Sequence, residues 1–175
     1  MANTFTFIQS YTVSTGSPTT FNLSSIPATY TDLCLRLSLR GSFAGGEDTP
    51  LIRFNGDAGS NYATIFASGR PNDIPTGNSS GTVTGAWVGT INGDGDTAGC
   101  YSNIEIWIPN YTSSDYKVCY ADSGTESMQV AVYQRALNSV WASTAAINQI
   151  TVGIVSGGYG FKQYSNAYLY GVSKS

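Results

Sequence analysis

The chain has 175 residues, of which only 11% are charged, and its formal net charge is −3. A chain of this length suits one all-β domain with its own core, so we expect a single domain over residues 1–175. The eight basic residues are scattered and no apolar run reaches membrane-spanning length, so the composition argues against nucleic-acid-binding and membrane-spanning proteins.

The first predicted strand lies at the N-terminus, because the stretch MANTFTFIQSYTV lacks the basic segment and long apolar run of a secretion signal. Residues 33–39 then place leucine at every second position, and strand side chains alternate between two faces. A helix would scatter these leucines around its circumference, so the spacing predicts a strand with one buried face. Residues 52–63 predict a hairpin that turns at Asn55-Gly56-Asp57.

Alternation with a period of two continues along the rest of the chain. It predicts strands near 5–10, 104–108, 116–121, 128–133, 150–155 and 167–172, and shorter ones at 19–23, 51–54, 61–67 and 83–91. A stretch rich in Pro, Gly, Asn and Ser over 69–81 predicts a long surface loop. The segment from Arg135 to Ile147 is the one helix candidate, of a turn or two at most.

Strands without helices between them favour antiparallel sheets packed face to face, because parallel strands need long crossover connections. We therefore predict an all-β fold, an antiparallel, jelly-roll-like β-sandwich. Cys34 and Cys119 lie in predicted strands and are interpreted as small buried side chains, whereas Cys100 follows a glycine-rich turn and could be exposed.

The sequence contains no histidine, which removes the commonest general base and the Ser–His and Cys–His nucleophile pairs. Most carboxylates follow turn signals, where they cap backbone amides, while Glu105 lies mid-strand, where we expect an ion pair with an arginine. We predict a protein that is not an enzyme and needs no cofactor. The carboxylates weighed as catalytic candidates are Glu47, Asp48, Asp57, Glu105 and Glu126.

The stretch from Asn92 to Asp96, NGDGD, has two interpretations. Oxygen ligands at alternate positions are typical of calcium loops, although Thr97 replaces the glycine that an EF-hand requires. The alternative is a hairpin turn between a strand ending at Ile91 and one starting near Ser102, which we favour, and we predict no metal site.

Aromatic residues in or near predicted loops are the candidate binding residues. Exposed rings can anchor a subunit interface or stack on sugars, and tyrosine also packs half-buried at the rim of a sandwich. These candidates are Tyr111, Trp141, Tyr159 and Tyr164.

Five stretches carry a family resemblance: SIPATYTDLCLRLSLRG (25–41), IRFNGDAGSNYA (52–63), IEIWIPNYTSSDYK (104–117), WASTAAINQIT (141–151) and the ending YSNAYLYGVSK. In this order they resemble a group of small virion proteins of tailed bacteriophages, abundant among phages of aquatic bacteria. The resemblance covers most of the chain. It implies a β-sandwich structural component of the particle and brings no catalytic residues with it.

The resemblance implies a protein that is made in the cytoplasm of the host bacterium and located in the virion. The first hypothesis is a capsid decoration or cement protein that bridges capsomers, binds the major capsid protein and forms a homo-oligomer, expected as a trimer. The alternative is a tail-fibre or receptor-binding module that recognises host surface glycans through the 69–81 loop and exposed tyrosines. A hydrolytic, tailspike-like enzyme is the third hypothesis.

Overall fold

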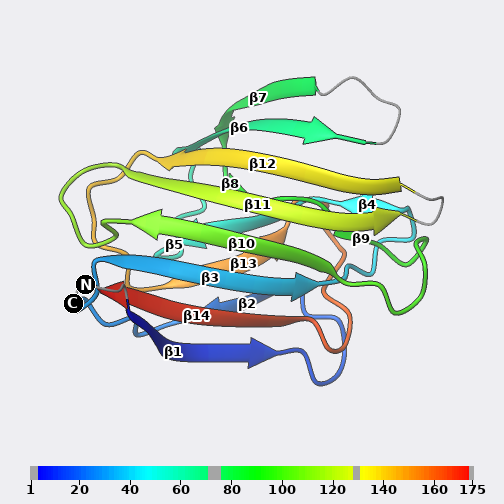
Figure 1. The fold of residues 1–175 in the computed structure, drawn as a ribbon, viewed down its shortest axis with the longest axis horizontal. Helices are drawn as coiled ribbons and strands as arrows, with labels where there is room; N and C mark the ends of the chain where they lie inside the picture. Colours follow the sequence, from blue (N-terminus) through cyan, green and yellow to red (C-terminus); the bar gives the residue numbers. More distant parts are fainter. Residues whose placement is uncertain (1–3, 71–75, 128–130, 174–175) are drawn as a thin grey trace.

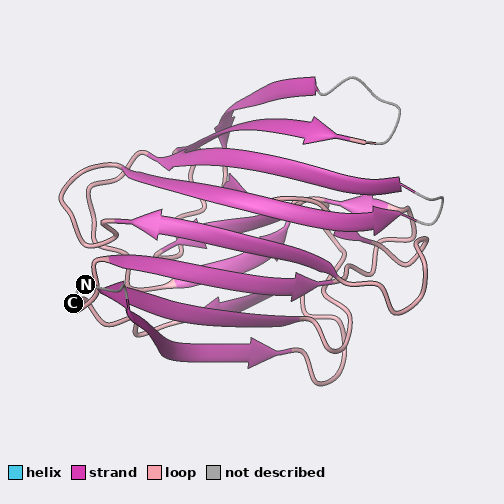
Figure 2. Ribbon diagram, in the orientation of Figure 1, coloured by secondary structure: helices cyan, strands magenta, loops and turns pink. Residues whose placement is uncertain are grey.

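The computed structural model describes residues 4–70, 76–127 and 131–173, which form strands joined by loops and turns (Figures 1 and 2). These residues include no helix, and therefore none that could cross a membrane. The strands are β1 (Thr4–Thr12), β2 (Thr20–Leu23), β3 (Asp32–Leu39), β4 (Glu47–Asp48), β5 (Pro50–Phe54), β6 (Tyr62–Gly69), β7 (Thr76–Val83), β8 (Ala86–Trp87), β9 (Ile91–Asn92), β10 (Ser102–Pro109), β11 (Lys117–Ser127), β12 (Ala131–Trp141), β13 (Ile150–Ile154) and β14 (Asn166–Ser173).

Two main sheets lie face to face (Figure 1). Eight strands form the larger sheet, in the order β1-β14-β3-β10-β11-β12-β6-β7, and four form the smaller sheet, in the order β2-β13-β5-β8. Strands β4 and β9 form a separate two-stranded ribbon. Neighbouring strands are antiparallel in all three sheets. The predicted all-β fold, with antiparallel sheets packed as a sandwich, is thereby confirmed.

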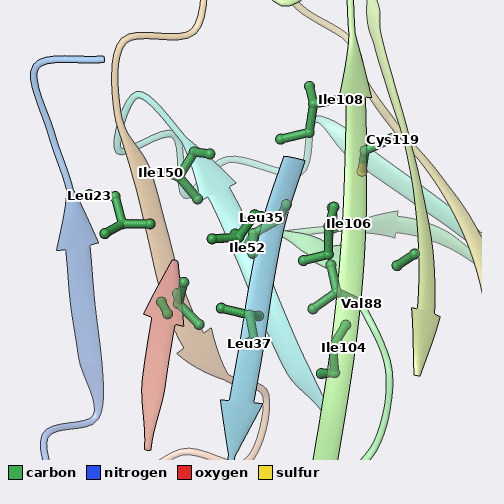
Figure 3. Packing of buried hydrophobic residues seen from close by; sticks show 14 of the residues in the cluster. Leu23, Leu35, Leu37, Ile52, Val88, Ile104, Ile106, Ile108, Cys119 and Ile150 are labelled. Carbon is green, nitrogen blue, oxygen red and sulfur yellow. The ribbon is translucent and has the colours of Figure 1, made fainter. Parts of the chain in front are cut away.

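The core lies between the inner face of the larger sheet and the smaller sheet (Figure 3). The leucines of β3 and the isoleucines of β10 are buried there, as their alternation predicts. Burying each such side chain contributes roughly 1.5–3 kcal/mol. The facing residues are Leu33, Leu35, Leu37 and Leu39 on β3, Ile104, Ile106 and Ile108 on β10, and Leu23, Ile52 and Ile150 on the smaller sheet.

On β11 and β14 the bulkier side chains face away from the core. Cys119 and Ala121 of β11 are buried, whereas Val118 and Tyr120, the alternate positions, are exposed. Tyr168 of β14 is exposed in the same way. Packed sheets are about 10 Å apart, and the leucines of β3 and the isoleucines of β10 already fill most of this space. Small side chains on the inner face of β11 fit beside them. The outer face of the larger sheet consequently carries aromatic rings.

Strand β1 confirms the predicted first strand but changes face along its length. A β-bulge between Phe7 and Gln9 shifts its register against β14. Before the bulge, Phe5 and Phe7 lie exposed on the outer face. After it, Tyr11 turns inward and stacks on Phe21, with 4.5 Å between ring centroids.

Two predictions for the middle of the chain are wrong. The helix candidate from Arg135 is strand as far as Trp141, because β12 pairs with β11 on one side and β6 on the other. The predicted loop over 69–81 contains most of β7, an edge strand that needs only one ladder of backbone hydrogen bonds, from β6. Residues 71–75, in that predicted loop, and 128–130, in a predicted strand, lie outside the described residues.

The hairpin predicted over 52–63 is instead a crossover between the sheets, because β5 pairs with β13 and β8 while β6 pairs with β12 and β7. Its turn is held by distant segments. Asn55, with φ at 53°, accepts a hydrogen bond on Oδ1 from the backbone N–H of Asn148 at 2.9 Å. Asp57 accepts one on Oδ2 from Nε1 of Trp141 at 2.7 Å. The predicted role of this turn in specifying the fold depends on these long-range contacts.

Replacing Ile106 with alanine should lower the free energy of unfolding by about 2–5 kcal/mol, because it opens a cavity between the sheets. Urea unfolding measures this change. The control is Ile65→Ala on β6, where the side chain is 59% exposed and the loss should stay below about 1 kcal/mol. Equal losses in the two variants would contradict the assignment of the inner face.

Alkaline pH should destabilise the protein through two buried groups. Burial raises the pKa of the Cys119 thiol from 9.0 to about 12 and that of the Tyr62 phenol from 10.0 to about 12. Both groups are uncharged when protonated, so the unfolded chain loses these protons at lower pH than the fold does. The stability that the two protonated groups contribute is complete at pH values below their pKa values in the unfolded chain. It is lost as the pH rises through their pKa values in the folded protein.

The measurement is the free energy of unfolding in urea at a series of pH values across this interval. Cys119→Ala should make its decline with pH shallower than in the unmodified protein. Identical slopes for the two proteins would show that the thiol does not contribute.

Candidate functional site

An open groove of about 660 Å³ crosses the outer face of the larger sheet. It spans β3, β10, β11 and β12, which lie side by side (Figure 1). Its volume falls within the roughly 300–1,000 Å³ typical of small-molecule sites. The side chains that characterise it are Arg36, Glu105, Trp107, Tyr120, Asp122 and Gln134.

Glu105 fixes one wall of this groove. Its Oε2 accepts a hydrogen bond from Nε of Arg36 at 2.9 Å, and its Oε1 accepts one from Nε1 of Trp107 at 3.0 Å. Glu105 and Arg36 are direct cross-strand partners, and the carboxylate raises the pKa of the guanidinium. This confirms the ion pair expected for Glu105. Both carboxylate oxygens are engaged, which orients the indole and neutralises the arginine.

Two aromatic residues occupy neighbouring positions in the lining of the groove, because Trp107 of β10 and Tyr120 of β11 are cross-strand partners. Phe5 of β1 packs edge-on against Trp107, with 5.7 Å between ring centroids. The indole is therefore supported on one side by Phe5 and tied through Nε1 to Glu105. Tyr120 is 42% exposed and presents its ring to solvent.

The next outward positions along β11 after Tyr120 are a polar residue, Asp122, and then Gly124, which has no side chain. Asp122 lies opposite Glu105, and Nε2 of Gln134 donates to Oδ1 of Asp122 over a long 3.4 Å. Gly124 follows, paired with Asn103 on one side and Gln134 on the other. A Cβ atom at Gly124 would meet nothing within 4 Å, so the groove floor is open here.

Sequence reasoning singled out Glu105 but none of the other groove residues. Alternation shows that Glu105 and Trp107 share a face, and that Tyr120 and Asp122 share one. The register that places the two pairs opposite each other is set by strand pairing, which alternation does not reveal. The groove could therefore be found only once the strands were aligned.

Two of the predicted binding aromatics belong to the core. Tyr111 is fully buried, and its hydroxyl donates to the carbonyl of Pro27 and accepts from the backbone N–H of Tyr30 at 3.4 Å. Trp141 is 3% exposed and directs Nε1 to Asp57, which lowers the pKa of that carboxyl. Neither ring is available to a partner.

The other two aromatics lie at the opposite end of the sandwich, in the connection between β13 and β14. Tyr159 is half-buried and packs edge-on against Phe43, with 4.9 Å between ring centroids. Tyr164 is 65% exposed and has φ at 71°. The four predicted residues are therefore not gathered into one site.

Arg40 holds the loop that contains the calcium-like stretch. Its buried guanidinium donates to the carbonyls of Asp96 at 3.0 Å, Thr97 at 2.7 Å and Cys100 at 3.0 Å. Asp96 in turn accepts on Oδ2 from Nδ2 of Asn92 at 3.2 Å. Several oxygens of this stretch thus have protein donors, and within the described ranges no cluster of three or more acidic, Cys or His side chains could hold a metal ion.

The same stretch is a turn, but it does not close a hairpin. β10 begins at Ser102 as predicted, yet it pairs with β3 and β11, whereas β9 pairs with β4. As at residues 52–63, the chain passes from one sheet to another at a turn that contains glycine.

Two cysteines, Cys34 and Cys119, are buried in β3 and β11, as predicted. Cys100 is partly exposed, and its thiol donates to Oε2 of Glu126 at 3.4 Å. The neighbouring carboxylate raises the pKa of Cys100, which disfavours its reactive thiolate form.

Comparison with protein-family models, with curated proteins and with solved structures finds no match for this chain.

Arg40→Met should lower the free energy of unfolding by roughly 3 kcal/mol, because three carbonyls lose a charged donor, while the methionine that replaces the arginine is apolar and of similar length. The control is Arg53→Met, since Nε of Arg53 makes an exposed hydrogen bond to the Thr84 carbonyl. Its loss should be about 1 kcal/mol or less. If urea unfolding gave both variants the same small loss, the loop would not depend on Arg40.

Proposed function

We propose that this chain is a structural protein of a tailed-bacteriophage virion and acts as a capsid decoration or cement protein that bridges capsomers. Its partner is the major capsid protein, and it reaches the virion after synthesis in the host cytoplasm. It works by binding, without catalysis or a cofactor. The sequence resemblance supports the virion assignment, and the observation that carries the binding role is the edge strand β1.

Strand β1 is the outermost strand at one edge of the larger sheet, next to β14. Its residues, TFTFIQSYT, include neither a charged residue nor proline. Soluble proteins protect long edge strands with charges, prolines or bulges, because the free N–H and C=O groups invite another strand. The bulge after Phe7 protects only the second half. The segment Thr4–Phe7 therefore suits an edge that a neighbouring subunit covers.

Three exposed rings beside this edge form what we call the edge patch: Phe5, Phe7 and Tyr168. Their exposed fractions are 45%, 55% and 40%. Exposed apolar surface of this kind marks interaction sites, and interface cores are depleted of charge. An interface that buries roughly 1,200–2,000 Å² gives stable association between two subunits. A trimer around a threefold axis of the capsid lattice would repeat this interface three times.

The double variant Phe5→Ser, Phe7→Ser should lose binding to phage heads, because it removes the apolar anchors of the edge patch. The measurement is co-sedimentation of purified protein with heads that lack it. The unmodified protein should saturate at the stoichiometry of the capsid lattice. Ile65→Ser, at an exposed position of β6 on the same face, is the matched control and should still bind. An isolated monomer in native mass spectrometry that ignores assembled heads would overturn the proposal.

The groove favours a second candidate function, a tail-fibre or receptor-binding module that recognises host surface glycans. Two aromatic residues at neighbouring positions offer apolar surface, and the carboxylate and amide groups beside them offer hydrogen bonds, a combination that suits sugars. The copy number of the protein in purified virions distinguishes the two candidate functions. A head protein is present in as many copies as the capsid lattice has sites for it, and a tail protein in a few copies.

A further inference from the structure

We propose that the groove across β3, β10, β11 and β12 binds a neutral oligosaccharide. The inference deepens the second candidate function, on which it rests, by assigning its ligand class and its residues. It places recognition on the sheet face instead of the 69–81 segment.

The aromatic pair supplies the apolar part of such a site. The ring of Tyr120 is exposed beside Trp107, whose indole is held by Glu105 and Phe5. The faces of aromatic rings carry partial negative charge, and the C–H groups on one side of a pyranose carry partial positive charge. A ring that is already oriented loses little conformational entropy when a sugar stacks on it.

Polar groups beside the rings match sugar hydroxyls. Asp122 offers carboxylate oxygens, and Gln134 and Asn103 each offer an amide donor and acceptor. The one bond between them, from Gln134 to Asp122, is long at 3.4 Å and leaves most of this capacity free. Hydroxyls both donate and accept, so planar carboxylate and amide groups can bind two adjacent ones at once.

The charges of the groove favour a neutral ligand. Arg36 is neutralised by Glu105 at 2.9 Å, so Asp122 supplies the net charge of the lining. A phosphate, sulfate or uronate group placed here would meet a like charge. A hydroxyl donor to the Asp122 carboxylate would instead make a charge-assisted hydrogen bond.

The position of the groove within the sheet argues against a peptide. Peptides that bind sheets usually add a strand to a free edge. β10 and β11 are paired on both sides, β10 with β3 and β11, and β11 with β10 and β12. Their backbone groups are therefore occupied, and a ligand must be recognised through side chains.

Two glycines provide a matched pair of variants. Gly124 lines the groove, and a side chain there would project into it without touching other atoms of the fold. Gly69 lies on β6, opposite Gln134 in the same cross-strand row, and also faces open space. Neither position has a positive φ, and valine suits a strand better than glycine. Gly124→Val should thus fill the groove, while Gly69→Val leaves it open.

The experiment uses the full-length protein on an array of neutral hexose, deoxyhexose and N-acetylhexosamine oligomers, with sulfated and sialylated oligomers as separate arms. Isothermal titration with the strongest neutral ligand follows. The unmodified protein should bind saturably. Gly124→Val and Tyr120→Ala should each weaken binding about tenfold or more, and Gly69→Val by less than about twofold. Thermal unfolding of each variant verifies the fold.

Absence of saturable binding to every neutral oligomer, binding confined to the charged arms, or binding that Gly124→Val leaves unchanged would each overturn the inference. Loss of head binding in Gly124→Val would also overturn it, by making the groove a protein contact. If the protein binds heads but no glycan, the proposed ligand is wrong and the decoration function stands. If it binds glycans and is present in virions at the copy number of the capsid lattice, the proposed ligand is right and the assignment to the tail is wrong.

Discussion

The leucine face of β3 and the isoleucine face of β10 pack against the smaller sheet, and the rest of the fold is arranged around this contact. A four-stranded sheet can cover only one face of an eight-stranded one, so the opposite face remains uncovered by it. Because side chains alternate, the strands that bury Leu35 and Ile106 also present Arg36 and Trp107 outward. The core and the groove are thus two faces of the same strands, and the packed core gives the groove a rigid floor.

Several of the charged residues hold loops and turns in place. Arg40 gathers three carbonyls of one loop, and the buried ammonium of Lys117 donates to the carbonyls of Ser113 at 2.8 Å and Asp115 at 2.5 Å. Asp57 ties the crossover turn to Trp141. The buried guanidinium of Arg40 and the buried ammonium of Lys117 thereby find acceptors among backbone carbonyls.

The edge patch and the groove lie on the same face and are compatible with simultaneous use. A partner that pairs with β1 extends the sheet sideways, and β14 separates β1 from the first strand of the groove. The face over β10 and β11 would then remain open. The two surfaces meet where Phe5 packs against Trp107, so anchoring at the edge would also steady the indole.

Alternation by itself determined that residues 33–39 and 104–108 are strands and which of their faces is buried, because leucine and isoleucine stand on one side only. It also predicted a strand over 150–155, of which Ile150–Ile154 form β13. It also predicted the ion pair of Glu105. It did not determine the faces of β11 and β14, where both sets of positions include apolar side chains, nor the crossovers at residues 55–57 and 93–101 or the bulge in β1. Those depend on which strands become neighbours and in what register, and the partners are distant in sequence. The groove was decided only by the tertiary structure, because its residues come together when four strands align.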